Sequence, residues 1–353
     1  MPLTDTRWDA PVLRVGERTY TWLDVLLSAM ARGEWAAFEQ HLRIGAACAA
    51  AADRSEAWPD REQVEAAANA FRYARNLLSS EETEAWLTER GLDLDLWSEV
   101  LLRDVLRAQW AGRPADRAGT DLAPAAFDAS LVAAEGICSG TFDIFATRLA
   151  ERASVAEALG ATAPALDLDA TAQQVLEAHR GWLSGRDRGD LIVRLAHVAR
   201  LERLEALDAE ATTTPDTLAV HLDRYRLDWI RVDLERLTFP TEQAAREAAW
   251  CVREDGLTLG DVAVASRRPI GDERVLLDQL PQPMRDAVLS ASPGDTVGPL
   301  TVDAAWLVAH VVAKVPATLD DALVRTRAAQ SVGEARRAKA VLSHAVWLDR
   351  ASA

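Results

Sequence analysis

Cysteine is scarce in this sequence, with three residues in a chain of 353. Cys48, Cys138 and Cys251 lie far apart, and no two of them have the Cys-x-x-Cys spacing of a zinc or redox site. This scarcity excludes a disulfide framework and is typical of a protein from a reducing compartment. None of the six histidines forms an i, i+4 pair on a helix either. We therefore expect no metal and no cofactor.

Positive charge is also in short supply. The chain has 39 lysine and arginine residues against 55 aspartate and glutamate residues, which gives a formal net charge of −16. Binding to a phosphate backbone requires clustered lysine and arginine, so a nucleic-acid partner is not expected. No segment approaches the roughly 20 uncharged residues of a membrane span, and the first twenty residues carry acids where a secretion signal would be apolar. The sequence predicts a cytoplasmic protein without a membrane partner.

Motifs of the common enzyme classes are missing from the sequence. We find no Ser/His/Asp or Cys/His arrangement and no glycine-rich loop of the phosphate-binding kind. What is present is a globular composition, with 49% hydrophobic and 27% charged residues. The length suggests two or three domains.

The most informative feature that is present is a repeat. GEWAAFEQHL, beginning at Gly33, has a near copy in GTFDIFATRL, beginning at Gly140, at an offset of 140 − 33 = 107 residues. Both copies have the form Gly-x-aromatic-x-x-Phe-x-x-x-Leu, so that the Phe and the Leu share one face of a helix that follows the glycine. AWLTERGL around Trp86 and GWLSGRDR around Trp182 form a second pair in the same order.

The repeat predicts how the chain divides into domains. Residues 13–112 and 125–225 are predicted to be two versions of one helical unit, joined by the linker AGRPADRAGTDLAP. The alternative is coincidence, because helices rich in alanine and leucine match one another easily. The expected domains are 1–112, 113–225, 226–316 and a C-terminal helix over 317–353.

Beyond residue 226 the hydrophobic period changes. DWIRVDLERLTF alternates apolar and polar residues, as a strand with one wet face does, and a slip of register is expected before Leu237. TEQAAREAAWCVREDG follows as a helix, with Thr241 at the N-cap. Two short helices, LGDVAVAS and PQPMRDAVLSA, precede two strands in DTVGPL and WLVAHVVAKV. From Thr318 to Ala353 the period is helical again, which predicts one long C-terminal helix.

This order of elements resembles the parvulin fold. The matching pieces are PTEQAA (240–245), REDGLTLGDVAVAS (253–266), LSASPGDTVGPL (289–300) and WLVAHVVAKVP (306–316). The preceding region is similar to the helical part of SurA-type chaperones and foldases. In particular, RVGERTYTWLDVL (14–26) resembles the usual opening of that part. A narrower resemblance is to the parvulin-related, PpiC-type maturation proteins found beside ribosomally made, post-translationally modified peptides. The resemblance implies a mostly α protein with SurA-like helical units, a C-terminal α+β parvulin-like domain and a long C-terminal helix.

The resemblance implies prolyl isomerase chemistry only where the two catalytic histidines of parvulins are present. Their first-strand position falls here at Glu235 or Arg236, and their last-strand position falls near Trp306 or Leu307. The catalytic pair is absent, and we expect a protein that binds peptide without catalysis. His310 lies on the face of Trp306 in the last expected strand and could line the degenerate cradle, although a partly buried structural histidine is the simpler interpretation.

The expected function is therefore that of a chaperone or adaptor that binds a precursor or unfolded peptide and assists the maturation of a ribosomally synthesised precursor. Strand addition or the cradle would hold the peptide, and peptide-modifying enzymes could be further partners. One alternative is an active peptidyl-prolyl isomerase that uses Glu235, Arg236 and His310, and another is a structural subunit of a peptide-modifying complex. The candidate peptide-binding residues are Trp229, Glu235, Arg236, Leu237, Trp306, Val308 and His310.

Overall fold

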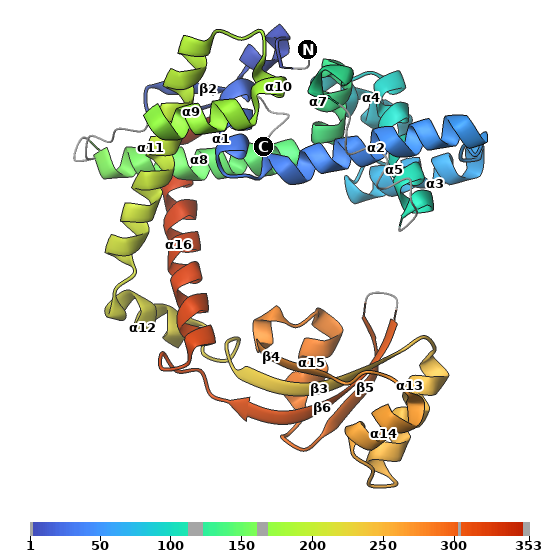
Figure 1. Cartoon of the computed structure of the whole chain (residues 1–353). Coiled ribbons are helices and arrows are strands. Elements are labelled where there is room, and N and C mark those ends of the chain that lie inside the picture. The colour runs from blue at the N-terminus through green and yellow to red at the C-terminus, as the bar shows by residue number, and fades with distance from the viewer. Residues whose placement is uncertain (1–2, 112–122, 161–168, 303–304, 349–353) are drawn as a thin grey trace. The chain divides into compact units, whose positions relative to one another are not determined.

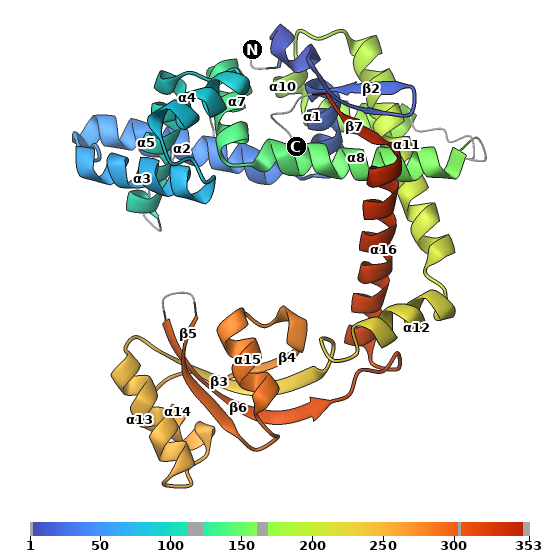
Figure 2. The same cartoon turned by 180° about the vertical axis from the view of Figure 1, so that it is seen from behind.

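The computed structural model of the chain forms two compact units (Figures 1 and 2). It describes residues 3–111, 123–160, 169–302 and 305–348. The helical unit comprises Met1–Asp208 and Arg337–Ala353, and the α+β unit comprises Ala209–Arg336. The chain passes from the first unit to the second within α11 (Arg188–Thr212) and returns within α16 (Ala322–His344). The linker expected at 111–124 lies almost entirely outside the described residues, so the boundary at 112/113 stays a prediction.

The helical unit consists of two series of helices and a small sheet. The first series is α1 (Trp22–Ala31), α2 (Trp35–Ser55), α3 (Arg61–Ala74), α4 (Ser80–Glu89) and α5 (Leu94–Trp110). The second series is α7 (Ala129–Cys138), α8 (Thr141–Leu159), α9 (Asp169–Ala178), α10 (Arg180–Leu183) and α11. Two 3-10 helices, η1 (Thr6–Asp9) and η2 (Pro124–Ala126), precede the sheet and α7 respectively.

The two segments that share the repeated sequence also share their local geometry. In both α1–α2 and α7–α8, a ten-residue helix is followed by a left-handed glycine, Gly33 or Gly140, with a φ of 73° in each case. Glycine adopts this conformation at no steric cost, which explains its place in both copies. Helix α1 packs against α8 and α2 packs against α7, so that the copies share one core. These observations support the proposed duplication.

Among the polar side chains that these two helix pairs bury, Ser28 and Glu135 occupy equivalent positions. Ser28 in α1 and Glu135 in α7 are 135 − 28 = 107 residues apart, which is the offset of the repeat. Arg152 Nη2 of α8 donates to Ser28 Oγ at 2.6 Å, and Arg107 Nη2 of α5 donates to Glu135 Oε1 at 2.5 Å. The equivalent of Arg152 in the first copy is Gly45, where a Cβ would lie 2.5 Å from Arg107 Nη2. Gly45 therefore leaves room for a guanidinium that α5 supplies instead.

The charge of Glu135 depends on its neighbours. Burial opposes ionisation, but the hydrogen bond with His41 Nε2 at 3.1 Å and the charge of Arg107 outweigh it. The pKa of Glu135 therefore lies below its ordinary value. Burial also lowers the pKa of Arg152, to about 10, which leaves this guanidinium charged at neutral pH.

In the helical unit, the end of α16 is followed directly by a strand. Helix α16 ends at His344, and β7 (Ala345–Trp347) pairs with β1 (Pro11–Val15), which also pairs with β2 (Arg18–Thr21). The expectation of one helix up to Ala353 is wrong in this respect. Strand β1 offers an open edge, and Ala-Val-Trp contains the β-branched and aromatic residues that fit a sheet, so pairing overrides the helical pattern.

Among the described residues, no single helix combines the length and the apolar composition of a membrane span. Helices α7 and α8 reach these limits only when taken together, and the pair is bent by 78°. Both helices contribute buried side chains to the core of the helical unit.

The α+β unit is a four-stranded antiparallel sheet with helices on both faces. Its strands are β3 (Arg231–Phe239), β4 (Gly271–Leu276), β5 (Thr296–Val302) and β6 (Ala305–Val315), in the order β4-β3-β6-β5. Its helices are α12 (Pro215–Arg224), α13 (Glu242–Arg253), α14 (Leu259–Ser266) and α15 (Gln282–Ser290), with the 3-10 helix η4 (Leu277–Gln279) before α15. The expected fold class, mostly α with an α+β part near the C-terminus, is confirmed.

Strand β3 buries apolar side chains on both of its faces. Val232 and Leu234 pack in a core with α15, whereas Leu237 packs in a second core with α13 and α14. The slip expected before Leu237 is therefore wrong, because the alternation continues and only the buried face changes. The irregularity lies between Asp233 and Leu234, where β6 carries the additional residue Val312.

Strand β4 was not expected from the sequence. Gly271–Arg274 reads Gly-Asp-Glu-Arg, and only the last two residues of the strand are apolar. An edge strand has one neighbour and can carry charges on both faces, so it lacks the apolar alternation that reveals buried strands. This charged strand is the edge of the sheet beside β3.

The buried ion pair leads to a test of stability. We predict that Arg107→Ala destabilises the helical unit by about 3 kcal/mol, because it removes the guanidinium from the buried Glu135 carboxylate and leaves only the hydrogen bond with His41. Urea unfolding followed by tryptophan fluorescence measures the change. The control is Arg61→Ala, which removes an arginine from a solvent-exposed pair with Glu65 and leaves the midpoint unchanged. Similar shifts for the two variants would contradict the role assigned to Arg107.

Candidate functional site

The register of β3 and β6 decides which candidate residues share a face of the sheet. Glu235 lies opposite His310, and Leu237 lies opposite Val308. Directly opposed residues of an antiparallel pair project to the same side, so all four side chains point to the face that α13 and α14 partly cover. Trp306 projects to that side as well, two and four residues from Val308 and His310.

The apolar candidates on this face belong to the core. Leu237 and Val308 are both 0% exposed and pack under α13 and α14, and Trp306 is half-buried against the same cluster. Their burial holds the two helices on the sheet. The surface open to a ligand is therefore the polar end of the face, near Glu235 and His310.

Arg236 and Trp229 lie apart from this surface. Arg236 projects to the opposite face, where its Nη1 lies 2.8 Å from Glu273 Oε2 of β4. Trp229 precedes β3, is 1% exposed, and stacks on Tyr225 with ring centroids 5.1 Å apart. Its cluster also contains Leu276 and side chains of α16. The structure does not bring Trp229 together with the polar candidates.

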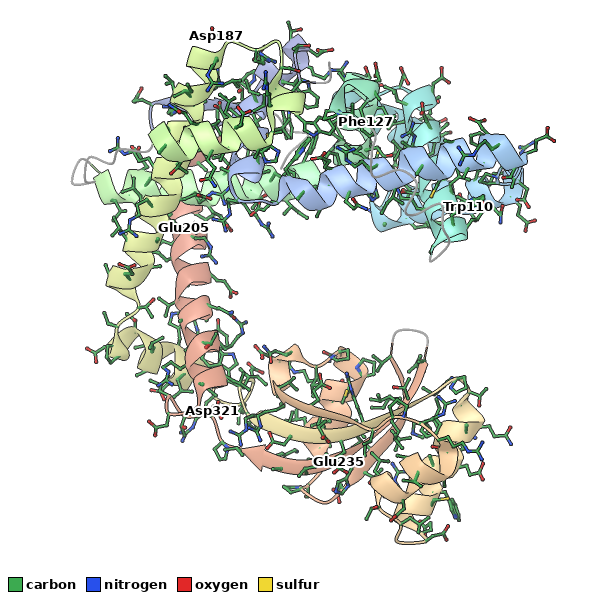
Figure 3. The ribbon with its side chains drawn as sticks, in the orientation of Figure 1. Trp110, Phe127, Asp187, Glu205, Glu235 and Asp321 are labelled. Carbon is green, nitrogen blue, oxygen red and sulfur yellow. The ribbon has the colours of Figure 1, made fainter. Side chains whose placement is uncertain are left out.

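Glu235 and His310 belong to a row of polar residues that crosses the whole sheet. Asp272 of β4 lies opposite Glu235, and Thr296 of β5 lies opposite His310. Neighbouring side chains in such a row are about 5 Å apart at their Cβ atoms. His310 Nδ1 and Thr296 Oγ1 are 3.3 Å apart. Figure 3 labels Glu235 on this sheet. Glu235 and His310 were among the residues expected from the sequence, whereas Asp272 and Thr296 were not.

The two carboxylates of this row have no partner in the described part of the chain. The side chains of Glu235 and Asp272 take part in no hydrogen bond and no ion pair there. The neighbouring Asp233, by contrast, lies 3.2 Å from Arg231 Nε and 3.1 Å from Arg274 Nε. Like charges that lie directly opposite on adjacent strands destabilise a sheet. The row is therefore a place where a bound cation would be stabilised.

A hollow of about 480 Å³ opens at this end of the sheet. Val312 lies in it and is 50% exposed, because the bulge in β6 turns this residue out of the ladder. The hollow thus offers carboxylate acceptors beside an apolar contact. Its lining residues are Asp233, Leu234, Glu235, Asp272, Glu273, Arg274 and Val312.

Strand β4 presents an open edge next to the hollow. One side of the strand pairs with β3 from Gly271 to Leu276. Within the described ranges, the backbone of β4 makes one further hydrogen bond, in which Leu276 N–H donates to Gln279 Oε1 at 3.0 Å. The outward N–H and C=O groups before Leu276 are therefore available to a further strand.

The helical unit contains an aromatic hollow of about 400 Å³. Trp8, Trp22 and Phe142 line it, and the ring centroids of Trp22 and Phe142 are 5.6 Å apart. Arg90 also lines it, with its guanidinium 4.1 Å from the centroid of the Trp86 ring. This size and lining suit one large apolar side chain of a ligand.

A cluster of possible metal ligands, of which only Glu135 is buried, lies in the same unit. Atoms of His41, Asp104 and Glu135, which are far apart in the sequence, come within 4.8 Å of one another. Arg107 already pairs with both carboxylates. A metal cation would have to displace this guanidinium, so the donor set fits a partly buried ion-pair network better than a metal site.

Comparison with known proteins does not place the chain in a family. No family model matches it, and no curated protein matches it. A 3.10 Å crystal structure of the foldase protein PrsA from Lactococcus lactis is similar over 56% of this chain and 76% of that chain, with 11% sequence identity and a TM-score of 0.27. A TM-score this low does not establish a common fold, and the site is therefore interpreted from its own geometry.

The polar row leads to a prediction about stability. We expect Glu235→Gln to stabilise the α+β unit by about 0.5 kcal/mol, because it relieves repulsion with Asp272. Thermal unfolding at low and high salt measures the gain, which salt should reduce. The control is Glu273→Gln, which removes a carboxylate that is already paired with Arg236 and brings no gain. Destabilisation by Glu235→Gln would show that the carboxylate has a partner.

Proposed function

We propose that this protein is a non-catalytic, peptide-binding chaperone or adaptor. It holds an extended peptide along β4, with a lysine or arginine of the peptide against Glu235 and Asp272. The observation that carries the proposal is the pair of unpartnered carboxylates beside an open strand edge.

Strand addition fits both features of the site. The outward backbone groups of β4 supply hydrogen bonds that do not depend on the sequence of the peptide. Alternate side chains of an added strand project to the same face, so every second residue of the peptide points toward the side of the row. A cationic residue at such a position would pair with Glu235 and Asp272, and its apolar neighbour could contact Val312.

The charge of the chain favours the same class of ligand. A net charge of −16 attracts peptides with basic segments and repels acidic ones over long distances. A disordered peptide loses conformational freedom when it binds, so the affinity is expected to be moderate and to depend on several contacts. The aromatic hollow of the helical unit offers one more contact, for an apolar side chain.

A narrower form of the proposal names the ligand. The resemblance of PTEQAA, LSASPGDTVGPL and the neighbouring segments to parvulin-related maturation proteins favours the precursor of a ribosomally made, post-translationally modified peptide. The protein would keep such a precursor extended and present it to modifying enzymes. A structural subunit of a modifying complex is the alternative, and it would bind an enzyme but no free peptide.

One observation favours a second candidate function, that of a prolyl isomerase. His310 and Glu235 lie directly opposite each other, and a polar pair beside a cradle could assist rotation about the X–Pro bond. Against it, the apolar residues on the face of His310, Leu237 and Val308, are both 0% exposed and already packed under α13 and α14. In the described residues, the space beside His310 is therefore polar and does not form an apolar cradle.

Fluorescence anisotropy tests the proposed binding. We predict that a labelled, extended peptide with one lysine binds with micromolar affinity, and that the double variant Glu235→Gln, Asp272→Asn weakens binding about tenfold, as expected for loss of a charged hydrogen-bonding partner. The same peptide with norleucine in place of lysine should bind the two proteins equally.

Asp255→Asn is the matched control, because it removes an exposed carboxylate from the same unit outside the row. It should leave the affinity unchanged. If the control loses as much affinity as the double variant, the effect is due to net charge alone. If no peptide binds, the structural-subunit alternative is favoured.

A protease-coupled assay with a proline-containing reporter peptide distinguishes the two candidate functions. We expect no acceleration of cis–trans isomerisation above the uncatalysed rate. Acceleration that is lost in His310→Ala and retained in the matched variant His344→Ala would overturn the non-catalytic assignment.

A further inference from the structure

A second polar site lies in the helical unit, where the β1–β2 hairpin meets α8 and α11. A hollow of about 340 Å³ opens there, and Tyr20 and His197 meet in it. Tyr20 Oη and His197 Nε2 are 3.0 Å apart, and the two ring centroids are 5.7 Å apart. The apolar part of its lining is formed by Val15, Ala153, Ala156, Leu201 and Leu204.

The Tyr20–His197 pair is neutral at physiological pH. Burial and the nearby guanidiniums of Arg18 and Arg200 lower the pKa of His197 to about 4, while Asp24 acts in the opposite direction. Burial raises the pKa of Tyr20 to about 12. The hollow therefore has an uncharged polar floor that can exchange hydrogen bonds with a ligand.

Two arginines that have no ion-pair partner among the described residues line this hollow. Arg18 comes from β2 and Arg200 from α11. The Arg18 guanidinium lies 5.5 Å from the centroid of the Tyr20 ring, which keeps it above the floor. Two guanidiniums next to neutral donors bind an oxyanion well.

The remaining charged residues select the kind of oxyanion. Glu17 and Glu157 also line the hollow and have no ion-pair partner in the described part of the chain. They repel a dianion such as phosphate more strongly than a singly charged carboxylate. The apolar walls favour an anion that carries an aliphatic group.

We propose that this hollow binds a carboxylate attached to an aliphatic group, held between Arg18 and Arg200 above Tyr20 and His197. The carboxylate could be the C-terminus of a peptide or that of a free acylated amino acid. The site lies in the helical unit and shares no residue with the polar row. Its test is therefore independent of the test of the proposed function.

Histidine NMR on the whole protein tests this site. N-acetyl-leucine is expected to bind and to raise the pKa of His197 by about one unit, because the carboxylate offsets the nearby guanidiniums. His197→Gln assigns the resonance. N-acetyl-leucinamide, which has the same aliphatic group and no charge, should cause no shift, and inorganic phosphate should bind at least tenfold more weakly than N-acetyl-leucine.

Variants of the two arginines complete the test. Arg18→Gln and Arg200→Gln should each weaken binding about tenfold. Arg203→Gln, on the same helix but outside the hollow, should leave binding unchanged, and circular dichroism confirms that all three variants fold.

A peptide with a C-terminal leucine, compared with its C-terminal amide, distinguishes the two sources of the carboxylate. If the free-carboxylate peptide binds and N-acetyl-leucine does not, the ligand is a peptide C-terminus. If N-acetyl-leucine binds as well, the site accepts any aliphatic carboxylate. Equal binding of acid and amide, equal binding of phosphate, or no binding of both N-acetyl-leucine and the free-carboxylate peptide would overturn the site.

Discussion

The pairing of β3 with β6 is the constraint on which the proposed site depends. Its register places Glu235 opposite His310 and Leu237 opposite Val308, and so divides one face of the sheet into a polar end and a buried end. The helices α13 and α14 cover the buried end. A shift of one residue would move Glu235 to the α15 core and Leu234 to solvent, which the apolar packing on both faces opposes. The two cores therefore fix the position of every residue in the polar row.

The same arrangement explains how an open strand edge can be retained. Exposed edges pair with other chains unless charge or shape prevents it. Strand β4 carries Asp272, Glu273 and Arg274, and of these only Asp272 is left without a partner in the described structure. The charges discourage pairing with arbitrary segments, while the unpartnered carboxylates favour a segment that carries a cation. In this account, protection of the edge and selection of the ligand depend on the same residues.

Much of this fold could be predicted from the sequence, because buried faces leave a periodic apolar pattern. The helices α13, α14 and α15 and the strands β3, β5 and β6 each have such a pattern. Strand β4 could not be predicted because an edge strand of charged residues has no such pattern. Strand β7 could not be predicted because its three residues directly follow a helical pattern. Glu235 and His310 could be found from their places in strands, whereas Asp272 and Thr296 join them only through cross-strand register, which is a long-range property. The close approach of the Arg107 guanidinium to Gly45 likewise depends on the three-dimensional structure and cannot be read from the sequence.

The central claim is that β4 receives an extended peptide at its outer edge. Hydrogen–deuterium exchange of the full chain, with and without a saturating lysine-containing peptide, tests it most directly, because strand addition must protect the outward amides of the edge strand. The account predicts slower exchange in Gly271–Leu276, with little change in β5 at the opposite edge of the sheet. Protection that is confined to the helical unit, or that falls on β5 and spares β4, would contradict it.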